Sequence, residues 1–151
     1  MKLTNYSDYA LRILIYLSLK KDKLSTISEI AESYCISRNH VVKIVHHLGQ
    51  LGYLDTMRGK HGGIRLAQAP EMINIGEVIR HTEVSMELVE CFSEQNACII
   101  CDSCVLRSII AEALMAFMEV LDKYTLADLI VPGHQLRKQL QVTDVYNHLV
   151  D

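Results

Sequence analysis

Four cysteines gather in one short stretch of the chain, where Cys91, Cys98, Cys101 and Cys104 lie within fourteen residues. Closely spaced thiolates can bind a soft metal, and they favour iron–sulfur clusters, zinc or copper(I) over hard cations. The spacing leaves the metal open, because the last three cysteines, each separated by two residues, also suit zinc. The stretch is therefore a candidate segment for metal binding or redox sensing.

The remaining sequence indicates where such thiols would work. The first residues lack the basic stub and the unbroken apolar stretch of a signal peptide. Arg107, Glu112 and Glu119 interrupt the most apolar segment, so no run approaches membrane-spanning length. We therefore expect a cytoplasmic protein. Thiols stay reduced in that compartment, which argues against structural disulfides.

The elements that could position these cysteines begin with three predicted helices. Apolar residues at helical spacing predict the first helix over residues 8–19. Thr26, with Glu29 three residues later, is a capping-box pattern that predicts the start of the second helix. Ser37 is a suitable N-cap for the third, which would bury Val41, Val42, Ile44, Val45, Leu48 and Leu51.

The second and third predicted helices are typical of a helix-turn-helix unit, whose second helix enters the DNA major groove. The opposite face of that helix carries Arg38, Asn39, His40, Lys43, His46, His47 and Gln50. An ordinary helical hairpin with a solvated face is the alternative. The next segment favours DNA binding, since residues 53–57 and 64–66 resemble two strands joined by a basic, glycine-rich turn. Arg58, Lys60 and Arg65 would supply the positive charge of such a wing.

The charge distribution agrees weakly with this interpretation. Residues 1–66 contain ten Lys or Arg and five Asp or Glu, whereas residues 67–151 contain five and thirteen. A basic surface neutralises phosphates, and the acidic remainder would be held away from the duplex.

A long helix is predicted directly after the cysteines. Residues 104–124 lack Gly and Pro, and apolar residues recur along them at helical spacing. One small domain would struggle to cover so wide an apolar face, so we interpret this segment as a dimerisation helix. A single helix buried in the core is the alternative.

These elements define the expected architecture. We predict a mainly α fold, with a winged helix-turn-helix domain, a two-stranded wing and a long dimerisation helix. The winged domain would span residues 1–68, and residues 69–103 would hold a short linker helix and the cysteine-bearing loop. The long helix and a short helix capped by Thr125 would fill residues 104–131. Residues 132–151 would form a polar tail, either loosely helical or mobile.

Three strings, "SRNHVVKIVHHL", "GYLDTMRGKHGGIRL" and "YTLADL", resemble the NsrR and IscR family of winged-helix regulators. The resemblance extends from Leu3 to about Ile130, and the wing string with its paired glycines is its most specific part. It implies a homodimer that binds palindromic operators in double-stranded DNA, with a cluster near the long helix controlling affinity.

Carried over by position, the resemblance implies that Arg38, Asn39, His40 and Lys43 face the major groove. It also implies that Arg58, Lys60 and His61 form the wing tip. Groove chemistry independently favours two of these, because Arg pairs best with guanine and Asn with adenine. His46 and His47 are weaker candidates, since histidines late in such a helix are more often solvated.

The implied cluster ligands are Cys91, Cys98 and Cys104. Cys101 is an addition to the family pattern and could be a fourth ligand, an exchange partner or a bystander. Some relatives take a further ligand from the first helix of the partner subunit, which corresponds here to Asp8. The other interpretation of Asp8 is a helix-capping or surface carboxylate. We expect an iron–sulfur cluster, of the 4Fe-4S type in preference to 2Fe-2S.

The IscR branch has a histidine three residues after its last cysteine, whereas this chain has Arg107. The difference favours the NsrR branch and implies a repressor that senses nitric oxide. A sensor of iron–sulfur cluster supply and a cluster-free thiol or zinc sensor are the alternatives. No enzyme is expected, because the sequence has neither a nucleotide-binding loop nor an evident pair of nucleophile and base. We expect Cys35, which has apolar neighbours, to be a small core residue.

Overall fold

Helix α1 lies at the centre of the computed structural model, which describes residues 2–21 and 23–142. It spans Asn5–Lys20, and Thr4 caps its start by accepting a hydrogen bond from the Ser7 backbone N–H at 3.2 Å. Because of this cap, α1 begins one turn before the predicted residue 8. Its buried face packs against α3, α4, β2, α6 and α7.

The predicted helix-turn-helix is present as α2 (Ile27–Tyr34) and α3 (Arg38–Gln50). The capping box at the start of α2 is confirmed, since the Thr26 N–H donates to Glu29 Oε2 at 2.6 Å and the Glu29 N–H donates to Thr26 Oγ1 at 3.2 Å. Ser37 caps α3 by accepting from the His40 N–H at 3.3 Å. Local capping thus fixes where both helices begin.

The expectation that Cys35 is a core residue is wrong. Cys35 ends α2 in the left-handed region, with φ 53° and ψ 39°, and its side chain is exposed. This backbone conformation turns the thiol outward, and Ile36, which is 8% exposed, occupies the core position instead.

The wing consists of β1 (Leu54–Met57) and β2 (Gly63–Leu66), paired antiparallel with Leu54 opposite Leu66. Two hydrogen bonds between Ser25 and Ile64, of 2.9 and 2.8 Å, join β2 to the segment before α2. Gly59 lies in the turn with φ +110°, a conformation that L side chains rarely adopt. The two-stranded wing predicted from the sequence is therefore confirmed and is anchored to the helical domain.

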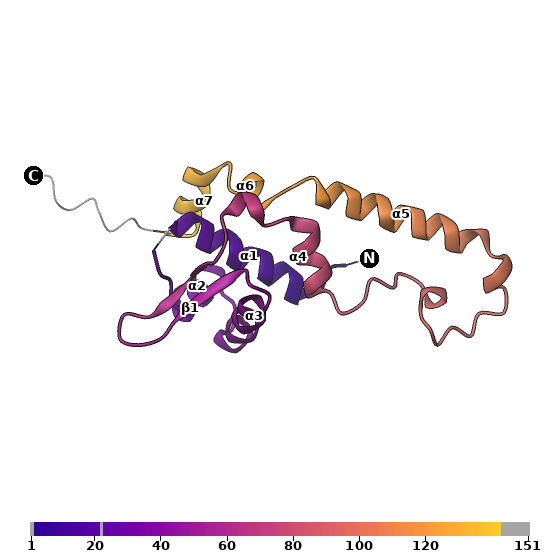
Figure 1. Cartoon of the computed structure of the whole chain (residues 1–151), viewed down its shortest axis with the longest axis horizontal. Coiled ribbons are helices and arrows are strands. Elements are labelled where there is room, and N and C mark those ends of the chain that lie inside the picture. The colour runs from indigo at the N-terminus through magenta and orange to yellow at the C-terminus, as the bar shows by residue number, and fades with distance from the viewer. Residues whose placement is uncertain (1, 22, 143–151) are drawn as a thin grey trace, which may run out of the picture.

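After the 3-10 turn η1 (Pro70–Met72), helix α4 (Ile75–Thr82) packs on α1. The Thr82 hydroxyl donates to Ser7 Oγ at 2.8 Å in a buried hydrogen bond. The chain then enters a loop that holds only two 3-10 turns, η2 (Glu90–Phe92) and η3 (Cys101–Ser103). Figure 1 shows this loop lying beneath the far end of α5, away from the winged helix.

Helix α5 (Val105–Asp122) returns from the loop to α4. Asp122 at its end accepts two hydrogen bonds from Arg80, at 2.7 and 2.6 Å. Gly76 in α4 allows this approach, because a Cβ at that position would collide with the Asp122 carboxylate. We call residues 83–117 the distal arm, and no residue of this segment is buried.

Two short helices complete the described chain. Thr125 and Asp128 form a capping box at the start of α6 (Leu126–Leu129), as the sequence predicted for Thr125. Helix α7 (Gly133–Gln139) begins inside the predicted polar tail. The rest of that tail, residues 143–151, lies outside the described residues. Among the residues described, no helix combines the length and apolar character needed to cross a membrane.

Candidate DNA-binding surface and metal centre

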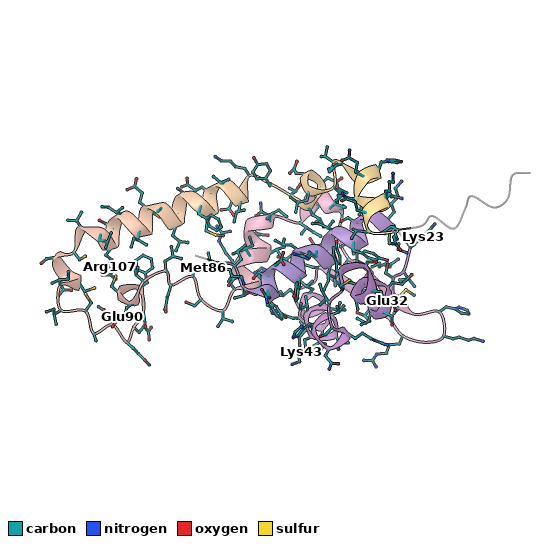
Figure 2. The ribbon with its side chains drawn as sticks, turned by 180° about the vertical axis from the view of Figure 1, so that it is seen from behind. Lys23, Glu32, Lys43, Met86, Glu90 and Arg107 are labelled. Atoms are coloured by element: carbon teal, nitrogen blue, oxygen red, sulfur yellow. The ribbon has the colours of Figure 1, made fainter. Side chains whose placement is uncertain are left out.

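The outer face of α3 presents the predicted groove residues to solvent. Arg38, Asn39, His40 and Lys43 are all exposed, and Figure 2 shows Lys43 on the free side of the helix. Ser37 positions the first turn, so three of these four side chains project from the N-terminal end of α3. Recognition helices contact base edges mainly with residues from this end.

Val42 belongs to the same surface, and its assignment to the buried side was wrong. Its side chain is 50% exposed, whereas Val41 and Ile44 are buried. Position 42 lies one helical turn after Arg38, and this i, i+4 relation could have placed it on the outer face. An exposed apolar side chain there can contact a thymine methyl group.

Two contacts with α1 fix the orientation of α3. Tyr6 Oη and His47 Nδ1 lie 2.9 Å apart in a hydrogen bond. Burial raises the pKa of Tyr6, so the phenol stays protonated at neutral pH and can donate to the imidazole. The ring of Tyr9 lies 6.3 Å from that of His40. His46 is exposed, but His47 is half-buried and anchors α3, so the interpretation of His47 as a solvated residue is wrong.

The wing separates its basic residues into a tip and a base. Arg58, Lys60 and His61 lie in the exposed turn, as predicted. Arg65 instead lies on β2 opposite Asp55, with Nη2 and Oδ2 3.5 Å apart. Its side chain also lines a cavity toward α1 and α7. Arg65 thus lies on the strand and not at the wing tip, although its side chain remains exposed.

The cysteine-bearing loop contains four free thiols in two environments. Cys91 in η2, Cys101 in η3 and Cys104 at the start of α5 are half-buried, whereas Cys98 is exposed. Partial burial and then the neighbouring thiol of Cys101 raise the pKa of Cys91, with a smaller contribution from Cys104, and Arg107 opposes the shift.

A surface cavity of about 640 Å³ opens beside these thiols. Cys101 and Cys104 line it together with Phe92, Asp102 and Arg107, and Figure 2 shows Arg107 and Glu90 at this end of the molecule. Two thiols line this shallow cavity and that of Cys91 lies close enough to interact with both, which provides a soft donor set that suits an iron–sulfur cluster. Within the part of the chain described, however, no three Cys, His, Asp or Glu side chains converge into a complete metal site.

The structure therefore brings Cys91, Cys101 and Cys104 into one neighbourhood and leaves Cys98 outside it. The Cys98 backbone N–H donates to Asn96 Oδ1 at 2.9 Å, which stabilises the local turn. None of the loop residues is buried, so few packing contacts oppose a rearrangement that would bring Cys98 inward. No signal in the sequence predicted this arrangement, because the convergence of thiols depends on the path of the loop.

Asp8 lies in the first turn of α1 and pairs with Arg12 at 2.8 Å. Both side chains are a little under half exposed, at 44% and 43%. In one chain Asp8 is thus a surface carboxylate with a cationic partner. The cysteine-bearing loop lies at the end of α5 that is remote from α1 (Figure 1), so an Asp8–cluster contact would need a second copy of the chain.

Helix α5 exposes an apolar face. Side chains exposed by 50–70% recur along it, namely Val105, Leu106, Ile109, Met115 and Val120, and Tyr124 just beyond its end is 48% exposed. Met118 is the only one of its eighteen residues that is buried. Most of α5 is therefore not covered by the rest of the chain, and an exposed apolar surface of this length favours an interface.

Comparison with known proteins agrees with this geometry. A sequence profile of the Rrf2 family, described as an iron-dependent transcriptional regulator, matches residues 3–132. The HTH-type transcriptional regulator NsrR of Bacillus licheniformis is 54% identical over 142 residues, covering 93% of this chain and 99% of that protein. The regulator of the same name from Bacillus subtilis is 51% identical over 146 residues, covering 95% of this chain and 100% of that protein.

Solved structures show the same fold. CymR, described as the global cysteine regulator of B. subtilis, superposes with a TM-score of 0.68 at 26% identity, covering 95% of this chain and 99% of CymR. IscR of T. potens superposes with a TM-score of 0.71 at 25% identity, covering 89% of this chain and 90% of that one. The similarity thus includes the distal arm as well as the winged helix.

Proposed function

Because the chain belongs to the Rrf2 family of transcriptional regulators, we propose that it is a homodimeric repressor that senses nitric oxide through an iron–sulfur cluster. DNA binding follows from the family and the winged-helix fold, and no enzymatic role is assigned to it. One observation supports the dimer and the cluster together, namely that the candidate metal-binding loop and the candidate interface adjoin in the chain. The cysteine-bearing loop leads directly into α5, whose exposed apolar face needs a partner.

DNA recognition would depend on α3 and the wing. Arg38 can donate two hydrogen bonds to guanine, and Asn39 can both donate a hydrogen bond to adenine and accept one from it. Lys43 and His40 extend the same exposed surface. Arg58, Lys60 and His61 at the wing tip would contact phosphates or the minor groove, where positive charge contributes affinity with little sequence preference.

Dimerisation would hold two copies of α3 at the spacing of a palindromic operator. Half-sites one helical turn apart are separated by roughly 34–36 Å. The apolar face of α5 would pack against the same face of a second copy, which removes its side chains from water. Any change in how the two α5 helices pack would alter the distance between the two recognition helices.

In the proposed metal centre Cys91, Cys98 and Cys104 would hold the cluster, with Asp8 of the partner subunit as the fourth ligand and Cys101 as the alternative to it. When bound, the cluster supplies thiolate-ligated iron, which nitric oxide can attack. Asp8 must leave Arg12 to serve as a ligand, so ligation would exchange an ion pair within α1 for a contact between subunits. A 4Fe-4S cluster is the proposed type.

A series of hydrogen bonds would transmit a change at the cluster to the DNA-binding helices. The Thr4 N–H donates to Glu83 Oε1 at 2.8 Å, which joins the start of α1 to the start of the distal arm. Desolvation opposes the shift, but hydrogen bonds from Ser7 and then from Thr4 lower the pKa of Glu83, which keeps the carboxylate ionised. Tyr6, two residues after Thr4, forms a hydrogen bond with His47 of α3. Movement of the distal arm would therefore act on α1 and α3 together.

A cluster-free thiol or zinc sensor is the second candidate. The observation that favours it is the position of Cys101, which lies beside Cys91 while the proposed ligand Cys98 is exposed. A sensor of cluster supply differs only in its signal, and the presence of Arg107 argues for nitric oxide. All three candidates share the same DNA-binding surface.

The deciding experiment is anaerobic purification followed by absorption spectroscopy and assays of iron, sulfide and zinc. We expect broad visible sulfur-to-iron bands and release of operator DNA on titration with nitric oxide, followed by fluorescence anisotropy. A colourless protein that contains zinc or only thiols would contradict the cluster and favour the second candidate. If the protein is coloured but its affinity for DNA does not change with nitric oxide, the proposal that nitric oxide is the signal would be contradicted.

Cysteine variants test the ligand set. Cys91→Ser, Cys98→Ser and Cys104→Ser should each abolish cluster retention, because thiolates are the main ligands of such clusters. Cys101→Ser is the matched control from the same loop and should remain coloured. Circular dichroism should show the same helical content in all four variants. A colourless Cys101→Ser protein, together with a coloured Cys98→Ser protein, would exchange the roles of these two residues.

A further inference from the structure

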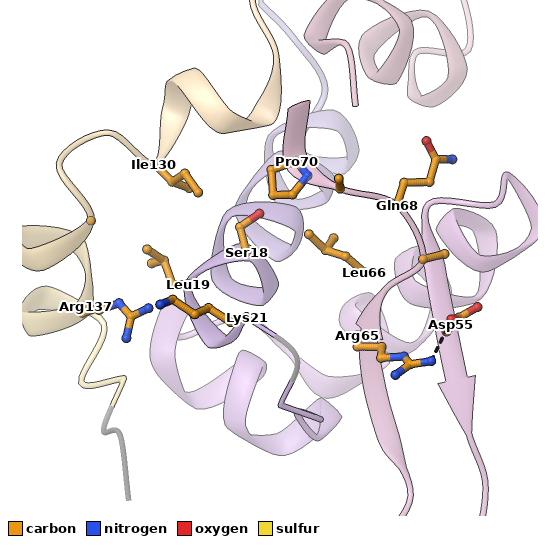
Figure 3. Close-up of a pocket in the computed structure, with 13 residues that line it drawn as sticks. Ser18, Leu19, Lys21, Asp55, Arg65, Leu66, Gln68, Pro70, Ile130 and Arg137 are labelled. Carbon is orange, nitrogen blue, oxygen red and sulfur yellow. Dashed lines mark hydrogen bonds and ion pairs between the residues drawn. The ribbon is translucent and has the colours of Figure 1, made fainter. Parts of the chain in front are cut away.

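A second cavity, of about 710 Å³, lies far from the cysteines, between the end of α1, the base of the wing and the segment α6–α7 (Figure 3). In Figures 1 and 2 helices α7 and α3 lie on opposite sides of α1, so the cavity is separated from the recognition surface. Its volume falls within the range of roughly 300–1,000 Å³ typical of small-molecule sites. Neither DNA contacts nor cluster ligation accounts for it.

The charged residues around this cavity are mainly cationic. Lys21 just after α1, Arg65 on β2 and Arg137 on α7 line it, and Asp55 is the single carboxylate among its lining residues. The Asp55–Arg65 pair is long, at 3.5 Å, and both side chains are about half exposed, so it neutralises Arg65 weakly. Lys21 forms no ion pair with any residue that the structure describes. The lining therefore favours an anion.

The rest of the wall is largely apolar. Leu19, Leu66, Pro70 and Ile130 line the cavity, and Figure 3 shows Ser18 on the side of α1 that faces Pro70 and Ile130. The Ser18 hydroxyl is buried and has no hydrogen-bond partner in the described part of the chain. Apolar walls with a few converging polar groups are characteristic of sites for small organic ligands.

We propose that this cavity binds a small organic anion with an apolar body, such as a carboxylate attached to a hydrocarbon chain or ring. The cations Lys21 and Arg65 would contact the carboxylate, and Leu66 and Ile130 would contact the apolar part. The site lies at the base of β2, so a bound ligand would join the wing to α1 and α7. This effect on the wing rests on the proposed DNA-binding function, whereas ligand binding itself does not.

The test uses the full chain without DNA and three probes of graded chemistry. 4-Phenylbutyrate has both the charge and the apolar body, 4-phenylbutanol lacks the charge, and acetate lacks the body. Amide NMR titrations should show saturable shifts for Leu66, Ala67, Gln68 and Gly133 with 4-phenylbutyrate only. Because binding is read at these amides, failure of the DNA or cluster proposals would not affect the outcome.

Variants separate the contributions of charge and space. Lys21→Gln and Arg65→Gln should each weaken 4-phenylbutyrate binding about three- to fivefold, as expected for one partly exposed ion pair. Lys123→Gln, which removes a lysine from the end of α5, is the matched control and should bind as the unaltered chain does. Ala69→Phe should abolish binding by filling the cavity, with the unfolding temperature checked to establish that the variant is folded.

Three outcomes would overturn the proposal. The first is the absence of saturable shifts at these amides. The second is equal affinity for 4-phenylbutanol, which would make the cavity a general apolar site. The third is equal affinity for acetate, or unchanged binding in both Lys21→Gln and Arg65→Gln, either of which would show that charge and body do not act together there.

Discussion

The winged helix and the distal arm differ in how each is stabilised. In the winged helix, α1 packs against helices on several sides, and Ile13, Leu14 and Leu48 are fully buried. In the distal arm no residue between positions 83 and 117 is buried, and Ile99 and Val84 are almost fully exposed. The first region can fold on the contacts of one chain, whereas the second lacks a core of its own.

This difference relates directly to function. A DNA-reading surface needs a rigid support, because base contacts require side chains held in register. A sensing segment benefits from low local stability, since ligand binding or loss can then change its conformation. The apolar face of α5 and the four thiols are the two features through which a second subunit and a metal would stabilise the distal arm.

The largest expected effect comes from the face of α5. Leu106 and Ile109 are 59% and 56% exposed, and a dimer would bury both. Replacing both by Glu should weaken dimerisation by at least about 3 kcal/mol, or roughly 100-fold, because each apolar side chain contributes about 1.5–3 kcal/mol when buried. Sedimentation velocity over a range of protein concentrations measures this change.

Glu112→Gln is the matched control for the double variant, because it alters charge on the same helix without introducing it on the apolar face. A dimer that survives both Glu substitutions unchanged would show that α5 is not the interface. A second subunit packed on α5 would then not explain why the distal arm lacks a core of its own.

The next effect compares stability in the two regions directly. Leu48→Ala, at a position with 0% exposure, should lower the free energy of unfolding by about 2–5 kcal/mol, since it removes buried contacts and leaves a cavity. Val84→Ala in the distal arm, where Val84 is 98% exposed, should change it by less than about 0.5 kcal/mol. Urea unfolding monitored by circular dichroism measures both free energies. If the two variants lost similar stability, the distal arm would have a core of its own.

A smaller effect concerns DNA specificity. Arg38→Ala should reduce operator affinity by about 1–3 kcal/mol and relax discrimination at one base pair, because a bidentate contact to guanine would be lost. Binding to operators with single base changes measures this. Gln50→Ala, at the other end of the exposed face of α3, is the control and should keep the preference. Unchanged specificity in Arg38→Ala would remove Arg38 from base recognition.

The sequence predicted the parts of this molecule that depend on neighbouring residues. Thr26 with Glu29, and Thr125 with Asp128, are capping boxes whose partners lie three residues apart, so pattern and structure agree. The wing was equally predictable, because glycines and alternating side chains define it locally. The resemblance to a known family added the expected roles of residues, most of which stay predictions.

What could not be predicted depends on packing between distant segments. Val42 is the exception: it is apolar yet exposed because α1 covers the opposite face of α3, and its i, i+4 relation to Arg38 could have indicated this. Cys35 is exposed because the end of α2 adopts a left-handed conformation that its apolar neighbours do not encode. The cavity at the base of the wing includes Arg137 from a segment interpreted as a tail, and no local pattern relates Arg137 to Lys21.

The smallest expected effect lies where α5, the helix that continues from the distal arm, meets α4 and Arg80 bonds Asp122. This hydrogen-bonded pair lowers the pKa of Asp122 and raises that of Arg80. A carboxyl group whose folded pKa is depressed contributes stability above its unfolded pKa, and this contribution is lost as the pH falls through the folded pKa. Arg80→Ala should therefore move the Asp122 titration toward higher pH and remove that acid dependence.

Carboxyl NMR titration of Asp122 measures the shift, and Lys123→Ala is the matched control because its cation is adjacent in sequence but takes no part in the pair. If Arg80→Ala leaves the titration unchanged, the ion pair is not populated in solution. The start of α4 and the end of α5 would then be joined by the Asn74 amide, which donates to the Asp122 carbonyl oxygen at 2.7 Å, and by the backbone hydrogen bond from Ile75 to Tyr124. In either case α4 is the element through which α5 contacts the winged helix, and the titration decides whether charge contributes to that contact.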